Sequence, residues 1–148
     1  MQLPPCHTVI SAPSHADTCD HVTLDYNGRF LRRKVLTTAR GARVLVDLEH
    51  TTSLNHGDAL NLEDGRLIEV RAANEDLMEV TGDLTRLAWH IGNRHMPCQI
   101  EADRLLIQRD HVIRDMLQKL GATLRDVTAP FTPEGGAYGH GRTHAHAH

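Results

Sequence analysis

The chain has 148 residues, which suffices for one ordinary domain or two small ones and excludes a large multidomain enzyme. Its 40% hydrophobic and 24% charged residues are typical of a soluble globular protein, and no apolar run approaches the roughly 20 residues that cross a bilayer. A net charge of −3 and an aromatic content of 3% exclude a basic nucleic-acid surface and a base-stacking platform. We therefore expect a small soluble protein that binds neither membranes nor nucleic acid.

The first 21 residues carry potential metal ligands but no targeting signal. The N-terminus lacks the positive region and the apolar stretch of a signal peptide, so we expect a cytoplasmic protein. Three cysteines in a reducing compartment favour free thiols or metal ligands over disulfides. The leader from Met1 to Asp20 is either disordered or part of an adventitious zinc or copper site. That site would use Cys6, His7, His15, Cys19 and His21.

Residues 22–70 alternate short apolar runs with turn residues, which predicts a small all-β domain. The pair Asp64-Gly65 between two such runs predicts a hairpin with a two-residue turn, because both residues tolerate positive φ. The basic run from Arg29 to Lys34 is interpreted as a solvated strand edge and not as a phosphate site. With the leader, this domain spans residues 1–73.

From residue 74 the pattern predicts the order β-α-β-β-α-β, the ferredoxin-like arrangement. Asp83 is the expected N-cap of a first helix that ends at Gly92, and Asp110 is that of a second helix that ends before Gly121. Strands are expected at 77–81, 98–102, 104–108 and 122–127. The second helix should bury one stripe, namely Val112, Ile113, Met116, Leu117 and Leu120. The fold class is therefore α+β, with the second domain at 74–132.

Histidine is the outlier in composition, with twelve residues. Prolines and glycines from Pro130 onward, with few apolar residues, predict a tail without a core of its own, assigned as a flexible His-rich tail at 133–148. Imidazole is the commonest protein ligand of borderline metals, so the tail indicates metal binding more than solubilisation or a purification remnant. Its candidate ligands are His140, His144, His146 and His148.

The chain contains no metalloprotease, phosphate-loop, nucleophile-elbow or dinucleotide-binding motif, so we do not expect an enzyme. At the end of the first helix, Pro97 blocks further helix and leaves His95 exposed, where it is either a metal ligand or a cation favoured by the helix dipole. We expect His90 to pack or hydrogen-bond, His111 to be an exposed first-turn residue, and Cys98 to be a small buried side chain.

The block His90-Ile91-Gly92-Asn93-Arg94-His95 resembles the marker of the UreE family of urease accessory proteins, the nickel metallochaperones. Further similar segments, in the same order, extend from about Leu24 to His148 and include residues 57–60, 63–65, 110–112, 129–134 and 136–139. The cysteine and histidine cluster of the leader departs from the family pattern, and Cys98 stands where the family usually has an apolar residue.

The resemblance implies a homodimer that binds Ni(II) as cargo and delivers it to apo-urease with an accessory GTPase, UreG. It also implies an N-terminal domain similar to the peptide-binding part of Hsp40-type chaperones, with metal binding and dimerisation in residues 74–132. In this family the second histidine of the block, His95 here, is the metal ligand. A two-fold axis would pair His95 with its own copy, and the tail histidines would complete the shell.

Three functions are therefore compared. Besides the nickel chaperone, the alternatives are a general His-rich metal buffer, for which the tail suffices, and a small metalloenzyme that uses His90, His95 and a carboxylate such as Glu101. Cu(II) or Zn(II) would compete with nickel, because copper stands above nickel in the order of divalent affinities. Metal stoichiometry in the tail-deleted protein separates the three: half an equivalent per chain for the chaperone, none for the buffer and one for the enzyme.

Overall fold

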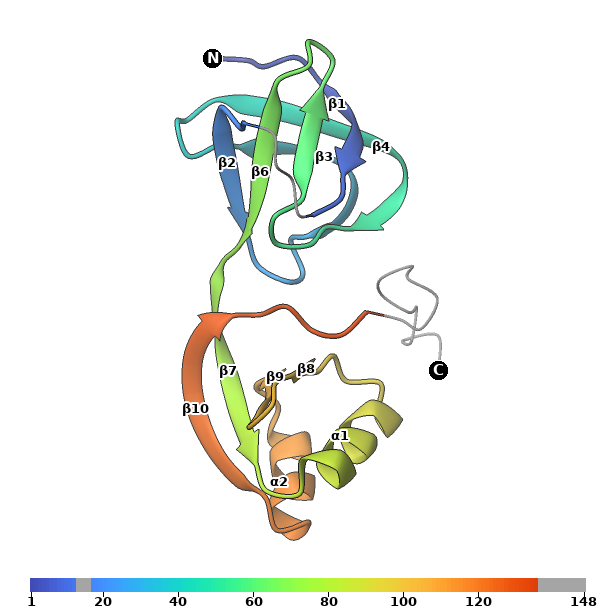
Figure 1. The fold of residues 1–148 in the computed structure, drawn as a ribbon, viewed down its shortest axis with the longest axis vertical. Helices are drawn as coiled ribbons and strands as arrows, with labels where there is room; N and C mark the ends of the chain where they lie inside the picture. Colours follow the sequence, from blue (N-terminus) through green and yellow to red (C-terminus); the bar gives the residue numbers. More distant parts are fainter. Residues whose placement is uncertain (13–16, 136–148) are drawn as a thin grey trace. The chain divides into compact units, whose positions relative to one another are not determined.

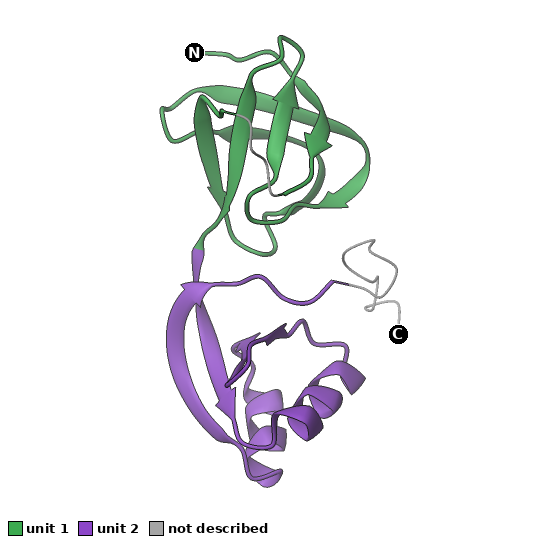
Figure 2. Cartoon of the chain, viewed as in Figure 1, with its two compact units in different colours: residues 1–73 green, residues 74–148 purple. Residues whose placement is uncertain are grey.

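The computed structural model describes residues 1–12 and 17–135, which belong to two compact units, Met1–Ala73 and Asn74–His148 (Figure 2). Strands dominate, and the described residues form ten strands and two helices (Figure 1). The predicted α+β class is confirmed. Neither helix is long and apolar enough to cross a membrane.

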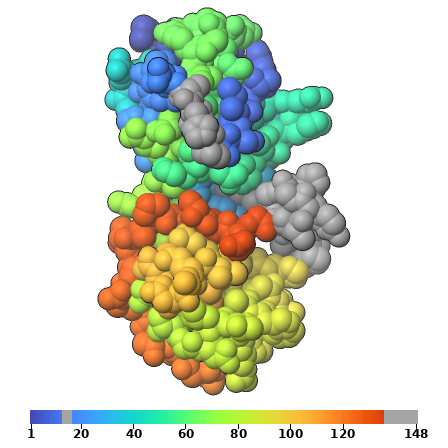
Figure 3. Space-filling model, in the orientation of Figure 1, coloured from blue at the N-terminus to red at the C-terminus, as the bar shows by residue number. Residues whose placement is uncertain are grey.

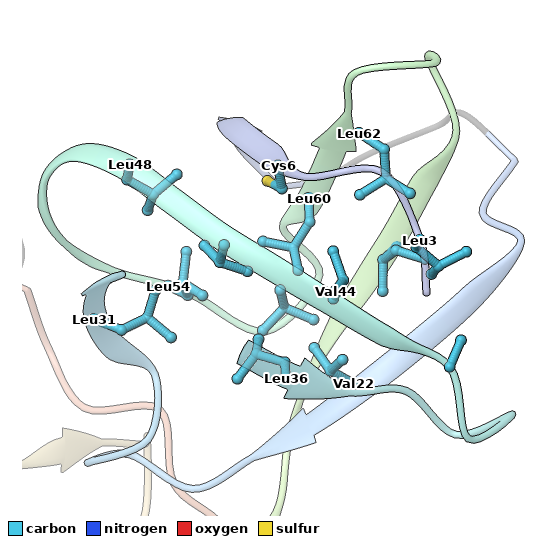
Figure 4. Packing of buried hydrophobic residues seen from close by; sticks show 14 residues of the cluster. Leu3, Cys6, Val22, Leu31, Leu36, Val44, Leu48, Leu54, Leu60 and Leu62 are labelled. Atoms are coloured by element: carbon cyan, nitrogen blue, oxygen red, sulfur yellow. The ribbon is translucent and has the colours of Figure 1, made fainter. Parts of the chain in front are cut away.

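Unit 1 is a single six-stranded sheet in the order β2-β6-β5-β1-β4-β3. Each strand contributes at least one buried apolar side chain to the same cluster (Figure 4). Its strands are β1 (Cys6–Ile10), β2 (Asp20–Leu24), β3 (Phe30–Thr37), β4 (Arg43–Ser53), β5 (Ala59–Leu62) and β6 (Leu67–Ala72). The prediction of an all-β N-terminal domain is confirmed.

Strand β1 corrects the interpretation of the leader as disordered. It lies inside the sheet, antiparallel to β5 and parallel to β4, and the side chain of Cys6 is completely buried. Upstream of β1, the Leu3 amide donates to the Arg43 carbonyl at 2.8 Å. Pairing with residues far along the chain therefore orders a segment whose prolines obscure any strand signal.

The predicted hairpin is present as β5 and β6, but its turn is longer than the expected two residues. The Leu62 amide donates to the Arg66 carbonyl, and the Gly65 amide donates to the Leu62 carbonyl, both at 2.9 Å. Gly65 has φ +88°, whereas Asp64 does not have positive φ. The turn is thus a three-residue loop with one left-handed glycine, which needs positive φ at one position only.

Arg29 does not belong to the solvated strand edge that was predicted for the basic run. Its side chain is 2% exposed, and its guanidinium donates to the carbonyls of Leu54 (3.2 Å) and Leu24 (2.8 Å). The following basic residues do fit the prediction, because β3 is an edge strand on which Arg32 and Arg33 are exposed. Arg29 therefore links the end of β2 to the segment that follows β4.

Unit 2 has the predicted ferredoxin-like fold. Its four strands lie in the order β10-β7-β9-β8 with antiparallel neighbours. Both helices pack on one face of this sheet, and the shared core includes Met78, Ile107, Ile91 and Leu117. The elements are β7 (Asn74–Thr81), α1 (Leu84–Asn93), β8 (Gln99–Ile100), β9 (Leu105–Gln108), α2 (His111–Lys119) and β10 (Thr123–Pro130).

The two helices begin at the predicted caps. The Asp83 carboxylate accepts the amide of Arg86, and the Asp110 carboxylate accepts the amides of Val112 and Ile113. The buried stripe of α2 is narrower than predicted, because Val112 is 56% exposed while Ile113 and Leu117 are buried. Val112 lies about 100° around the helix from Ile113 and so reaches the edge of the packed face.

The chain continues beyond β10 as a strap, residues 131–134, which corrects the prediction of a coreless tail from Pro130. Phe131 is completely buried, the Thr132 amide donates to the Gln99 Oε1 atom at 2.8 Å, and the Glu134 amide donates to the Cys98 carbonyl at 2.9 Å. In the space-filling view, the orange-red strap lies against the gold surface around β8 (Figure 3). The four tail histidines lie outside the described residues.

Candidate metal centre

His95 occupies the turn that ends α1. The His95 amide donates to the Gly92 carbonyl at 2.9 Å, and the Met96 amide donates to the Ile91 carbonyl at 3.3 Å. This pair of bonds is the Schellman motif, in which the residue after the C-cap takes the left-handed conformation. His95 has φ +57°, and no other non-glycine residue in the described ranges has positive φ. The predicted helix end at Gly92 is therefore wrong, and α1 runs through this glycine.

A histidine at this position costs conformational energy. The left-handed region disfavours a residue with a Cβ atom by about 1–2 kcal/mol, which is why glycine usually follows a helix C-cap. Contacts on both sides hold the turn in place, because Ile91 is fully buried and Met96 packs against the same core. Such strain is concentrated at functional sites, where a side chain is needed that glycine lacks. The backbone thus presents the exposed imidazole of His95 as a fixed feature of the surface.

The surface beside His95 is a groove between α1 and α2. The groove has a volume of about 510 Å³ and begins at the C-terminal end of α1. Two large apolar side chains nearby are well exposed, Trp89 on α1 (64%) and Val112 on α2 (56%). The residues that line the groove are His90, Asn93, Arg94, Val112, Asp115, Met116, Lys119 and Leu120.

The other candidates around His95 do not complete a metal site. His90 is half-buried, and its ring makes an edge contact with the Trp89 ring at 5.0 Å between centroids. His111 is exposed at the start of α2. The Glu101 carboxylate accepts from Arg104 Nε at 3.0 Å and from Gln99 Nε2 at 2.8 Å. Within residues 1–12 and 17–135, no three ligand-type side chains converge.

Cys98 is a poor ligand despite its position close to His95 in the sequence. Burial raises the pKa of its thiol to about 11, and the negative charge of Glu134 adds to the shift. The group is therefore a neutral thiol at pH 7, whereas metals bind the thiolate. The side chain is half-buried and not fully buried as predicted.

The leader residues predicted as an adventitious site do not come together. Cys6 and His7 lie on β1 and His21 lies on β2, and β5 and β6 separate the two strands, a distance of about 14 Å across the sheet. The ring of His7 is already bonded to the Asp47 carbonyl (3.0 Å) and to Glu63 Oε2 (2.9 Å). His15 lies outside the described residues.

Two family models together match residues 3–148 of the chain. Residues 3–73 match the model described as UreE urease accessory protein, N-terminal domain, and residues 66–148 match the corresponding C-terminal domain. The chain belongs to the UreE family. This confirms the resemblance inferred from the residues around His95, and it shows that the chain is an accessory protein and not an enzyme.

Curated UreE relatives agree over nearly the whole length. The urease accessory protein UreE of Ruegeria pomeroyi is 68% identical over 149 residues and covers 100% of both chains. The UreE of Rhodobacter capsulatus is 59% identical over 140 residues, 95% of this chain and 90% of its own. That of Paracoccus denitrificans is 55% identical over 141 residues, 94% of this chain and 90% of its own. UreE membership therefore applies to both units.

Sequence reasoning missed the strap and the left-handed turn. A local signal existed for the strap: Phe131 is an isolated aromatic residue in a polar segment, in a chain with only two phenylalanines. A signal also existed for the turn. Pro97 disfavours a helical conformation at Met96, so the helix must end before Met96 and His95 lies where the turn is expected.

Proposed function

We propose that this UreE chain binds Ni(II) as cargo through His95 and delivers it to apo-urease in the cytoplasm. The observation that supports this assignment is the strained left-handed backbone at His95, which keeps an exposed imidazole where glycine would be more stable. Family membership supports the same role, because UreE proteins are urease accessory proteins.

We propose further that nickel lies between two chains. A single imidazole binds nickel weakly, and within the described residues no group of three or more histidine, cysteine or carboxylate side chains could hold a metal ion. A two-fold axis beside His95 supplies a second imidazole without any further sequence. Trp89 and Val112 are exposed next to the same end of α1 and give this surface the apolar area that self-association requires.

The tail histidines complete the shell in this proposal. Tethering makes their binding intramolecular, so even weak ligands contribute at an effective concentration that reaches the millimolar range. The candidates are His140, His144, His146 and His148. Imidazole ligands also accept Cu(II) and Zn(II), so selectivity for nickel comes from geometry and metal supply.

Two protein partners follow from this role, the urease apoprotein complex and the accessory GTPase UreG. Unit 1 is the proposed protein-binding part, by its similarity to the peptide-binding part of Hsp40-type chaperones. Its sheet ends in two edge strands, β2 and β3. The His21 carbonyl of β2 already accepts the Ala39 amide at 2.9 Å, so β3 is the edge that we propose an extended segment of a partner joins.

Calorimetric titration of nickel into the full chain and into a chain ending at Gly139, combined with sedimentation, tests the proposal. We expect a dimer and half an equivalent of tightly bound nickel per truncated chain. No tight binding after truncation would favour a tail buffer. One equivalent per chain would place a complete site within a single chain and refute the shared one.

A further inference from the structure

The face of the unit 2 sheet opposite the helices carries buried residues that the helices do not cover. Met78 and Ile107 belong to the helix-side core, and the strand alternation turns their neighbours Leu77 and Leu106 to the other face. Both leucines are nevertheless completely buried, as is Phe131 of the strap, and none of the three belongs to the helix-side cluster. The strap therefore contributes a fully buried apolar side chain that lies outside the helix-side cluster.

The strap joins the two edges of this sheet. It leaves β10 at one edge, and its Thr132 and Glu134 amides are bonded to Gln99 and Cys98 at the start of β8, the other edge (Figure 1). The Gln99 side chain is itself held, because its Nε2 atom donates to Glu101 Oε2 at 2.8 Å. The strap is thus held by the buried side chain of Phe131 and by two hydrogen bonds, at Thr132 and Glu134, which we call its anchors.

These anchors lie close to His95 along the chain. Cys98 is three residues from His95, which limits their separation to about 11 Å. His140 is six residues from Glu134, a reach of up to about 20 Å. A chain that starts from the Glu134 anchor can therefore bring its first histidine to His95.

We infer that the strap is a positioning element: it fixes the start of the histidine-bearing segment beside His95, and Phe131 and Gln99 are its positioning residues. This inference rests on the proposed nickel site and adds to it a structural reason why the tail and His95 act together. It assigns a role to residues that are neither ligands nor part of the helix-side core.

Release of the strap has a calculable effect. The tether would then begin at Pro130, about 14 Å away across three strand spacings, and would lengthen from six residues to ten before His140. Effective concentration falls roughly as the −3/2 power of tether length, which gives about twofold. We therefore expect a loss of tail-dependent affinity of at least about twofold.

A metal-free measurement tests the position directly. In a chain with Cys19→Ser, a nitroxide attached at Thr143→Cys should broaden the amide resonance of His95. Phe131→Ala and Gln99→Ala should each reduce this broadening and speed hydrogen exchange at the Glu134 amide. Gln118→Ala, an exposed glutamine on α2, is the matched control and should change neither signal.

Two results would overturn the inference: rapid exchange at Glu134 with undiminished broadening at His95, or an unchanged Glu134 amide in both variants. If Phe131→Ala fails to fold, Gln99→Ala decides alone. Nickel titration separates this inference from the proposed function. We expect each strap variant to lose at least about twofold in affinity in the full chain and nothing in a chain ending at Gly139. If the full chain gains nothing from its tail, the tail's part in the proposed site fails while the metal-free result stands.

Discussion

Replacement of His95 by glycine should stabilise unit 2 and abolish tight nickel binding in the same protein. Glycine relieves the cost of the left-handed conformation, about 1–2 kcal/mol, at φ +57°. Against this, glycine adds freedom to the unfolded chain, worth about 0.4–1 kcal/mol. The net expectation is a gain of about 0.5–1 kcal/mol, because both Schellman hydrogen bonds are made by backbone atoms and remain.

Alanine and asparagine are the matched controls at this position. His95→Ala removes the imidazole but keeps a Cβ atom, so its stability should stay close to that of the parent chain. His95→Asn should fall between alanine and glycine, since asparagine tolerates the left-handed region. All three variants should lose the tight nickel site, so stability and binding separate within one series.

Denaturant unfolding of the metal-free proteins measures this series. Trp89, the single tryptophan, lies on α1 and makes its fluorescence a probe of unit 2. For a domain of this size, 0.5–1 kcal/mol corresponds to roughly 2–8 °C in Tm. A glycine variant no more stable than the alanine variant would refute the strain at His95. A glycine variant that keeps the tight nickel isotherm would refute the assignment of His95 as ligand.

Four further predictions concern other parts of the chain. Truncation after Gly139 should lower the number of bound nickel ions and weaken the remaining site without changing the dimer; calorimetry and sedimentation check this, and an unchanged stoichiometry contradicts it. Thiol alkylation should leave nickel binding intact, because the raised pKa of Cys98 keeps it a neutral thiol. Nickel binding should fall as pH drops from about 7.5 to 5.5, since protons compete with the metal for imidazole. Loss of the tight isotherm after alkylation would favour a cysteine ligand. Hydrogen bonds to the Asp47 carbonyl and then to Glu63 raise the pKa of His7. The charged imidazole therefore stabilises unit 1 below the unfolded pKa of about 6.5, and this contribution disappears as pH rises through the folded pKa. Melting curves should show that His7→Gln is more destabilising at pH 5.5 than at pH 9, and equal losses at both pH values would contradict the raised pKa. Asp58→Ala should cost unit 1 about 1–3 kcal/mol in chemical unfolding, because its carboxylate accepts two backbone amides at 2.7 and 2.8 Å, and Asp58→Asn should cost less; equal stability of the parent and alanine proteins would refute this role.

The sequence was sufficient to predict the starts of both helices, because interactions between residues close in sequence determine them. Asp83 and Asp110 could be predicted as N-caps, because each carboxylate accepts a hydrogen bond from a backbone amide only two or three residues later in the sequence. Gly92 misled for the same local reason: glycine favours the left-handed residue that follows a helix end, but α1 continues to Asn93 and His95 takes that conformation, because Ile91 is buried and Met96 packs against the same core. Tertiary packing therefore determined the one backbone feature that most concerns the candidate site.

Non-local pairing explains the other differences. Strand β1 is specified by partners about 40 and 56 residues away, Val46 and Leu62, which no window of sequence reveals. The strap likewise is bonded to residues about 33 and 36 positions earlier in the chain, Gln99 and Cys98. The candidate site was predicted as far as His95 and its exposure, because Pro97 must end the helix. The strap was not predicted, because its anchoring depends on hydrogen bonds to Gln99 and Cys98 that no local pattern indicates.

The central position of β1 has a consequence for biosynthesis. Strand β1 is synthesised before its partners β4 and β5, so its pairing cannot be complete before Leu62 has been synthesised. Contacts between such distant segments close slowly, because the loop entropy is lost before the pairing stabilises the sheet. During that interval the apolar faces of β1 to β4 have no finished sheet to cover them. Removal of the residues of β1 from the N-terminus would therefore take a strand from the middle of the sheet, not from its edge.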